Sequence, residues 1–299
     1  MGAVFVLLSA VGFGLMAIFA KLAYAEGADV GGLLVIRFGL AGAALLAVSL
    51  VTGALRRLDR RTVLAGLGMG VFGYAAQAGL YLAAVARVDA SEVALVFCVY
   101  PVLVMVAAVA IGRERASGRR LVALALALSG SALVLGGVSS RGGGFDVVSA
   151  ALSLGSALVY TVYILVGDRV VRDAPAVPLT ALVCVGAFAS CTIAGLVTGG
   201  PDLSMPAAGW AWIGVIALVC TVGSILLFFS GLARVGPSMA ALLSGIEPVV
   251  TVGAAALVFG EVLTTAQTLG GVLVLAAVVL VQWRTSAPRV VAPRVPARV

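Results

Sequence analysis

The chain of 299 residues is 63% hydrophobic and 10% charged, with a mean hydropathy of +1.22. Soluble domains carry about 25% charged residues, so this composition excludes a soluble fold and indicates an integral membrane protein surrounded by the lipid bilayer. The formal net charge of +7 would suggest nucleic-acid binding in a soluble protein. Here the arginines flank apolar segments, so we expect no nucleic-acid partner.

Ten apolar segments of roughly 20 residues, the length of helix that crosses a ~30 Å hydrocarbon core, follow one another along the chain. They span residues 3–20, 30–52, 63–86, 93–111, 121–138, 147–166, 178–198, 209–232, 238–259 and 264–283. Unpaired backbone groups are costly in hydrocarbon, and the segments are too long and too uniformly apolar for barrel strands. We therefore predict an all-α integral membrane protein with ten transmembrane helices.

The second half of the chain repeats the first at an offset of 147 residues. Matching pairs include Arg87 and Arg234, Pro101 and Pro248, and Glu114 and Glu261. Each half holds five segments, and an odd number of crossings turns the second half upside down relative to the first. Such inverted repeats are typical of secondary transporters, whose substrate binds between the halves near the bilayer midplane.

The repeat also defines the predicted domain organisation. We expect a first five-helix repeat over residues 1–138, a glycine-rich linker over 139–146, a second repeat over 147–284 and a disordered tail over 285–299.

The basic residues predict the orientation in the membrane. With a cytoplasmic N-terminus, fifteen arginines fall on the cytoplasmic side, against Lys21, Arg87 and Arg141 on the outer side. This asymmetry follows the positive-inside rule, so we predict that both termini are cytoplasmic.

Polar side chains form stripes along several segments. Tyr74, Gln77 and Tyr81 are spaced i, i+3, i+7, which places them on one helix face. Similar stripes occur in the sixth, seventh, eighth and ninth segments, and the cavity is expected to be lined by the third, fourth, sixth, eighth and ninth. We predict that these faces line a central substrate cavity, although hydrogen bonding between helices is the alternative. The predicted substrate-binding residues are Tyr74, Gln77, Tyr81, Tyr100, Tyr160, Tyr163, Ser224, Phe228 and Ser244.

Two ionisable residues lie inside apolar segments, and such groups are functional candidates in membranes. Arg37 in the second segment and Glu247 in the ninth are expected at similar depths, where they would form a charge pair or serve in coupling. Arg37 could instead extend alone toward the outer surface. Pro101 and Pro248 are the predicted hinges, with a simple packing kink as the alternative.

Cofactor and enzyme motifs are missing from the sequence. Gly68, Gly70 and Gly73 match G-x-G-x-x-G but lie in a predicted membrane helix, which favours close helix packing over dinucleotide binding. The cysteines have no metal-ligand spacing. The chain contains no histidine and no G-x-S-x-G motif, so we expect neither an enzyme nor a metal or cofactor site.

The matching segments FCVYPVLVMVAAVAIGRE (97–114) and SGIEPVVTVGAAALVFGE (244–261) resemble the ten-helix EamA-type permeases of the drug/metabolite transporter superfamily. Arg37 fits the arginine of that family's second helix, whereas Arg113 interrupts the usual Gly-Glu pair before Glu114. Within the family, the chain is similar to bacterial amino-acid and metabolite exporters, including the aromatic amino-acid branch.

We therefore expect a secondary transporter of the bacterial inner membrane that moves a small amphipathic substrate, such as an amino acid, as a monomer or homodimer. A passive facilitator or channel is one alternative. The other is an exchanger of nucleotide sugars or triose phosphates, which the scarcity of basic residues inside the membrane disfavours.

Overall fold

The computed structural model describes residues 1–111, 118–139, 146–170, 174–197, 200, 204–235, 240 and 243–282. All regular secondary structure in these ranges is helical. Most of the predicted linker, all of the predicted tail, and Glu114 lie outside them.

The first half contains α1 (Gly2–Ala25), α2 (Val30–Val51), α3 (Arg60–Gly68), α4 (Ala75–Val85), α5 (Ala90–Phe97), α6 (Tyr100–Ala110) and α7 (Gly118–Ser139). The second half contains α8 (Val147–Val170), α9 (Ala176–Val197), α10 (Ala207–Val215), α11 (Ser224–Val235), α13 (Glu247–Phe259) and α14 (Thr265–Gln282). A short 3-10 helix, η1, covers Leu55–Arg57. Two π-helices, η2 (Met69–Tyr74) and η3 (Ile216–Gly223), join α3 to α4 and α10 to α11.

Six helical stretches of the described chain are long and apolar enough to cross a membrane: Gly2–Ala25, Val30–Val51, Arg60–Val85, Val147–Val170, Ala176–Val197 and Ala207–Val235. Shorter apolar helices occupy the other predicted segments. The total of ten crossings and the cytoplasmic termini therefore stay predictions.

The helices deviate from regular α-geometry at repeat-related positions. The π-helices η2 and η3 begin at Met69 and Ile216, which are 147 residues apart. The fourth and ninth segments are each broken into two, at Cys98–Val99 and at Gly245–Ile246, again 147 residues apart. The structure thus keeps the register of the sequence repeat.

The two prolines lie elsewhere in their helices than expected. Pro101 and Pro248 do not interrupt a continuous helix, because each lies in the first turn of the half-helix that follows the break, α6 or α13. An amide hydrogen in the first turn has no partner within its own helix, so proline costs little there. The discontinuity is the turn before the proline, and the hinge role stays a prediction.

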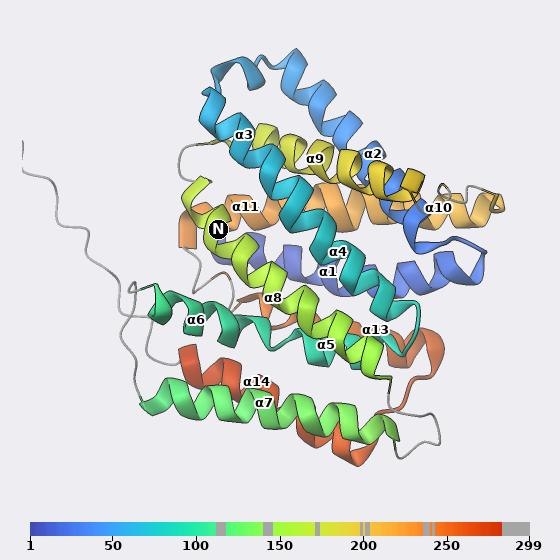
Figure 1. The fold of residues 1–299 in the computed structure, drawn as a ribbon, viewed down its shortest axis with the longest axis vertical. Coiled ribbons are helices and arrows are strands. Elements are labelled where there is room, and N and C mark those ends of the chain that lie inside the picture. Colours follow the sequence, from blue (N-terminus) through green and yellow to red (C-terminus); the bar gives the residue numbers. More distant parts are fainter. Residues whose placement is uncertain are drawn as a thin grey trace, which may run out of the picture.

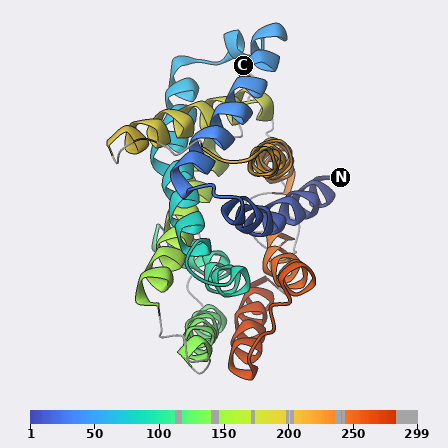
Figure 2. The same ribbon diagram turned by 90° about the vertical axis from the view of Figure 1, so that its right-hand side faces the viewer.

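Helices of the two halves pack against one another. α7 lies along α14, and α2 packs against α9 (Figures 1 and 2). The pairs α1 with α11 and α4 with α8 are also in contact, and the repeat relates these two pairs to each other. The core is therefore built from both halves together.

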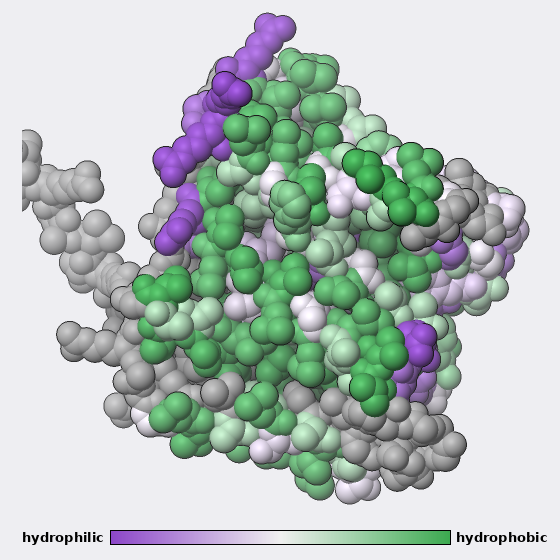
Figure 3. Space-filling model, in the orientation of Figure 1, coloured by the Kyte–Doolittle hydropathy of each residue, from purple (hydrophilic) through white to green (hydrophobic). Residues whose placement is uncertain are grey.

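The outside of the molecule is apolar and the inside holds charge, which is the reverse of a soluble protein. Leu257 is 89% exposed and Phe72 is 79% exposed, whereas Arg37 is completely buried. Figure 3 shows a largely hydrophobic face, with hydrophilic residues gathered at its upper left edge and at a spot on the right. Such a surface is suited to lipid.

Polar contacts join the ends of helices that the sequence places on the outer side of the membrane. Lys21 Nζ lies 3.6 Å from Asp89 Oδ1 and 3.5 Å from Glu261 Oε1. Glu261 also accepts hydrogen bonds from the Ser91 hydroxyl at 2.6 Å and from the Ser91 amide at 3.2 Å, which caps the start of α5. The end of α1, the start of α5 and Glu261, just after the end of α13, thus meet on the side predicted to be outer.

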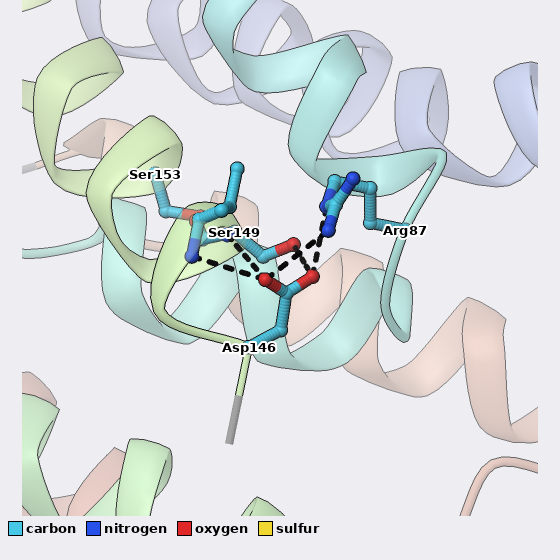
Figure 4. Close-up of polar contacts among 5 residues, drawn as sticks. Arg87, Asp146, Ser149 and Ser153 are labelled. Carbon is cyan, nitrogen blue, oxygen red and sulfur yellow. Dashed lines mark hydrogen bonds and ion pairs between the residues drawn. The ribbon is translucent and has the colours of Figure 1, made fainter. Parts of the chain in front are cut away.

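A second contact on the same side joins Arg87 to Asp146 (Figure 4). Arg87 Nε lies 2.8 Å from Asp146 Oδ2, and the same carboxylate accepts hydrogen bonds from the Ser149 hydroxyl at 2.8 Å and the Val148 amide at 3.0 Å. The hydrogen bonds from Arg87 and Ser149 lower the pKa of Asp146 to about 2. Asp146 thereby caps α8 and ties it to the end of the third segment.

Candidate functional site

A cluster of aromatic rings fills the junction between the two halves. Tyr160 on α8 lies near its middle, with ring centroids 4.9 Å from Tyr100, 5.5 Å from Phe97, 6.0 Å from Tyr163 and 6.5 Å from Phe228. These rings come from α5, α6, α8 and α11, so both repeats contribute. The structure thus brings together side chains that sequence spacing placed on separate helix faces.

The cluster continues toward the second and third segments. Tyr74 lies 5.6 Å from Tyr163, and Tyr81 lies 5.2 Å from Phe97, measured between ring centroids. The six aromatic residues predicted to bind substrate therefore belong to one connected set. They are Tyr74, Tyr81, Tyr100, Tyr160, Tyr163 and Phe228.

Four phenylalanines of the cluster were not predicted: Phe13, Phe38, Phe97 and Phe229. The repeat contains a signal for two of them. Phe13 is the first-half counterpart of Tyr160, and Phe97 is the counterpart of Ser244. Adding the repeat counterpart of every predicted substrate-binding residue would have included both.

Two of the predicted polar residues use their side chains in contacts between or within helices. Gln77 Nε2 donates to Ser156 Oγ at 3.2 Å, and Ser156 Oγ donates to the Gln77 carbonyl at 3.0 Å, which ties α4 to α8. Ser224 Oγ donates to the Val219 carbonyl at 3.1 Å. The Ser224 carbonyl accepts from Ser9 Oγ at 2.7 Å. The Gln77 side chain thus joins two helices, whereas the Ser224 hydroxyl binds a carbonyl of its own helix.

Arg37 on α2 is completely buried and is held by two hydroxyl groups. Its Nε donates to Thr221 Oγ1 at 2.7 Å, and its Nη2 donates to the Tyr74 hydroxyl at 2.8 Å. The rings of Phe38 and Tyr74 flank the guanidinium, with centroids 4.7 Å and 5.5 Å from Cζ. Its Nη1 has no hydrogen-bond partner in the described part of the chain.

Tyr74 and Thr221 are counterparts in the repeat, 147 residues apart, and each lies in a π-helix. Single-turn π-bulges within α-helices occur frequently at functional sites. Here they place two repeat-related hydroxyls at the Nε and Nη2 atoms of one arginine. Thr221 Oγ1 is itself oriented by donating to the Ile216 carbonyl at 2.9 Å, a contact within η3.

Glu247 is the first residue of α13 and is 8% exposed. Across the described residues, no hydrogen bond or ion pair is found for its carboxylate, and none joins it to Arg37. The carboxylate lies within electrostatic range of Tyr81, Tyr100 and Tyr160. Glu247 and Tyr100 are themselves counterparts in the repeat. The predicted pairing with Arg37 is therefore not formed in this conformation.

Unpartnered hydroxyl groups remain inside the aromatic cluster. The hydroxyls of Tyr100 and Tyr163 are buried without a hydrogen bond of normal geometry in the described ranges, although the Ser244 hydroxyl lies near Tyr100. Ser244 is itself buried, just before the break that precedes α13. Buried polar groups normally have partners, so these hydroxyls are available to a ligand.

Glycines allow the helices around the site to approach closely, as the sequence predicted. A Cβ atom on Gly70 would lie 2.2 Å from the Val183 carbonyl oxygen, and one on Gly73 would lie 3.0 Å from the Tyr163 ring. Gly186 on α9 is equally confined, because its Cβ would lie 2.4 Å from the Leu67 carbonyl oxygen. Gly68, by contrast, has nothing within 4 Å. Close packing thus applies to Gly70 and Gly73.

Comparison with known proteins supports the repeat and identifies the family. The model of the EamA-like transporter family matches residues 1–136 and again residues 148–283. Two transporters of Bacillus subtilis that are named as uncharacterized are similar to the chain. YcbK is 26% identical over 278 residues, with 90% of this chain and 88% of the relative covered. YyaM is 24% identical over 248 residues, with 80% of each covered.

The overall fold is also found among solved structures. One crystal structure superposes with a TM-score of 0.68 and covers 94% of this chain and 96% of its own. The sequences are 17% identical, so this likeness concerns the fold alone.

Proposed function

This chain belongs to the EamA-like transporter family, and we propose that it is a ten-helix secondary transporter of the bacterial cytoplasmic membrane. As a family member it is a multi-pass membrane transporter. The proposal adds that it moves small amphipathic metabolites such as amino acids, by alternating access, with both termini in the cytoplasm. Export is the expected direction because of the resemblance to exporters.

The observation that carries this proposal is the aromatic cluster at the junction of the repeats. Inverted-repeat transporters bind substrate near the midplane between the halves. The cluster supplies apolar ring faces and the buried hydroxyls of Tyr100 and Tyr163, which have no hydrogen bond of normal geometry in the described part of the chain, and the buried charges of Arg37 and Glu247 lie close to it. Mostly apolar walls with a few polar groups suit a small amphipathic molecule.

Alternating access is supported by the repeat-related irregularities of the helices. Discontinuous helices near the midplane are a common feature of secondary transporters. Here the breaks before Tyr100 and Glu247, and the π-helices η2 and η3, occur at matching positions of both halves. If the two halves exchange conformations during transport, the backbone at these matching positions of both halves is expected to change in the same step.

The decisive experiment is counterflow in proteoliposomes containing the purified full-length protein. Vesicles are loaded with one unlabelled amino acid at a time, and uptake of the same labelled amino acid at trace concentration is followed. A carrier gives a transient overshoot that saturates with substrate, whereas a channel gives simple equilibration. A variant with Tyr160→Ala, which removes the ring that contacts four others, is expected to lower or abolish the overshoot.

Two results would contradict the proposal. Equilibration without saturation or overshoot would favour the passive facilitator. Counterflow of phosphorylated sugars in place of amino acids would favour the exchanger of phosphorylated substrates.

A further inference from the structure

The hydrogen bonds of Arg37 leave the arginine with unused donors. Thr221 and Tyr74 act as neutral acceptors for Nε and Nη2, and Nη1 has no acceptor in the part of the chain that the structure describes. Neither acceptor carries a formal negative charge. The positive charge of Arg37 is therefore solvated by hydroxyls and ring faces and is not neutralised by an ion pair.

An uncompensated buried charge is costly. Cation–π contacts with Phe38 and Tyr74 reduce that cost, but each contributes only about 0.5–2 kcal/mol. The burial penalty for an ion is several kcal/mol even after relaxation. Binding of an anion would lower this cost, so the buried arginine favours an anionic ligand.

Donor hydrogens near Arg37 lack acceptors among the described residues. The Tyr74 hydroxyl accepts from Arg37, and its own hydrogen is not donated in any contact found among the described residues. The buried Tyr163 hydroxyl has no partner there either, and the Tyr163 ring lies 5.6 Å from the Tyr74 ring. The missing partner is thus a group rich in lone pairs, which describes a carboxylate.

We propose that Arg37 and Tyr74 form the binding site for the carboxylate group of the transported substrate, with the ring of Tyr163 beside that of Tyr74. This inference rests on the proposed function and adds to it the position and chemistry of one end of the substrate. The aromatic rings that continue from Tyr74 through Tyr163 to Tyr160 provide the adjacent apolar surface for the rest of the molecule. Repeat-related Tyr74 and Thr221 hold the guanidinium at the junction of the halves.

The test uses a matched set of probes on the full-length protein in lipid nanodiscs. L-Phenylalanine and 3-phenylpropionate carry a carboxylate, whereas L-phenylalanine methyl ester and 2-phenylethylamine do not. Apparent affinities are obtained from the rise in melting temperature with probe concentration. A charged hydrogen-bonded contact corresponds to about tenfold to a hundredfold in affinity, so both carboxylates should bind that much more tightly than the ester and the amine.

Substitution of Arg37 tests the residue itself. In Arg37→Gln the preference for acid over ester should fall to near unity, and in Tyr74→Phe, which keeps the ring, it should fall partway. Arg87→Gln, a charge removal at the outer side, is the matched control and should keep the full preference. If Arg37→Gln does not fold, the wild-type acid-to-ester ratio and Tyr74→Phe still decide the question.

The outcomes separate the inference from the proposed function. If carboxylates stabilise the protein selectively but no amino acid shows counterflow, the carboxylate site is supported and the proposal of amino-acid transport is contradicted. Amino-acid counterflow with equal binding of acid and ester would overturn the anion site alone. Stabilisation by chloride or phosphate at matched ionic strength, with no competition from the organic carboxylates, would mark an inorganic-anion site and also overturn the proposal.

Discussion

Tyr74 and Thr221 occupy the same position in the two repeats, and both hydroxyls accept a hydrogen bond from the single guanidinium of Arg37. An arginine from the first half is thus bound by equivalent positions of both halves. We therefore expect the contacts of Arg37 to change when one repeat moves relative to the other during transport.

Glu247 is predicted to couple transport to protons. No partner for its buried carboxylate is found among the described residues, and such a charge costs several kcal/mol in the membrane unless a proton or a cation neutralises it. With Glu247→Gln, accumulation driven by a pH gradient should disappear while substrate exchange survives, as measured by labelled uptake into proteoliposomes. Glu26→Gln at the outer end of α1 is the control and should keep both activities.

Glu247→Gln also tests the alternative that Glu247 forms a structural ion pair with Arg37. If Glu247 and Arg37 do not interact, the destabilisations caused by Glu247→Gln and Arg37→Gln should add within about 0.5 kcal/mol in the double variant. Strong non-additivity of the melting data would show that the two charges pair in another conformation.

Tyr100 is predicted to serve binding through its hydroxyl and stability through its ring. Because the hydroxyl is buried without a normal hydrogen bond in the described chain, Tyr100→Phe should leave the melting temperature unchanged or raise it slightly while changing substrate affinity. Tyr100→Ala removes a ring that packs on Phe97 and Tyr160 and should cost about 3 kcal/mol. A large loss of stability in Tyr100→Phe would mean that the hydroxyl has a structural partner.

The orientation in the membrane is testable by cysteine labelling. In a version without native cysteines, a cysteine at the exposed Gly27 should react with an impermeant reagent added to intact cells, and one at the exposed Arg60 should not. Permeabilisation should make both reactive, which controls for local accessibility. Labelling at Arg60 with protection at Gly27 would reverse the assigned faces.

The Arg87–Asp146 contact predicts a pH dependence of stability. The pKa of Asp146 is lowered in the folded protein to about 2, below its unfolded value of about 3.9. Its contribution is therefore present above pH ~4 and is lost as the pH falls toward 2. Wild-type melting temperature should drop across that range more than that of Asp146→Asn, which keeps a capping side chain. Parallel curves for the two proteins would contradict this assignment.

Close packing at Gly70 predicts that alanine substitution there destabilises the protein more than alanine substitution at Gly68. Gly70→Ala drives a methyl group into the backbone of α9 at Val183, so the protein should lose stability by about 1–3 kcal/mol. Gly68→Ala, two residues earlier and without a neighbour within 4 Å, should be neutral or slightly stabilising because alanine favours helix. Thermal unfolding of the two variants measures the difference, and equal effects would place the helix contact elsewhere.

Local patterns were sufficient for the helical class, the repeat and the tyrosine faces. Spacings such as that of Tyr74, Gln77 and Tyr81 depend on helix geometry within one segment, and the prolines marked the discontinuities to within about two residues. Apart from Phe228, the phenylalanines of the cluster were not predicted in this way. Phe72 is 79% exposed and Phe97 is 4% exposed, yet both are apolar residues in apolar segments, so composition cannot separate a ring facing lipid from one in the core.

The sequence by itself determined that this is a membrane-embedded repeat protein with Arg37 and Glu247 inside apolar segments, because hydropathy and internal similarity are properties of the chain. Only the tertiary structure decided what those charges contact. Arg37 and Thr221 are 184 residues apart in the chain, and whether they meet depends on how α2 packs beside η3. The predicted ion pair and the observed hydroxyl contacts are both compatible with the residue pattern, and helix packing alone distinguishes them.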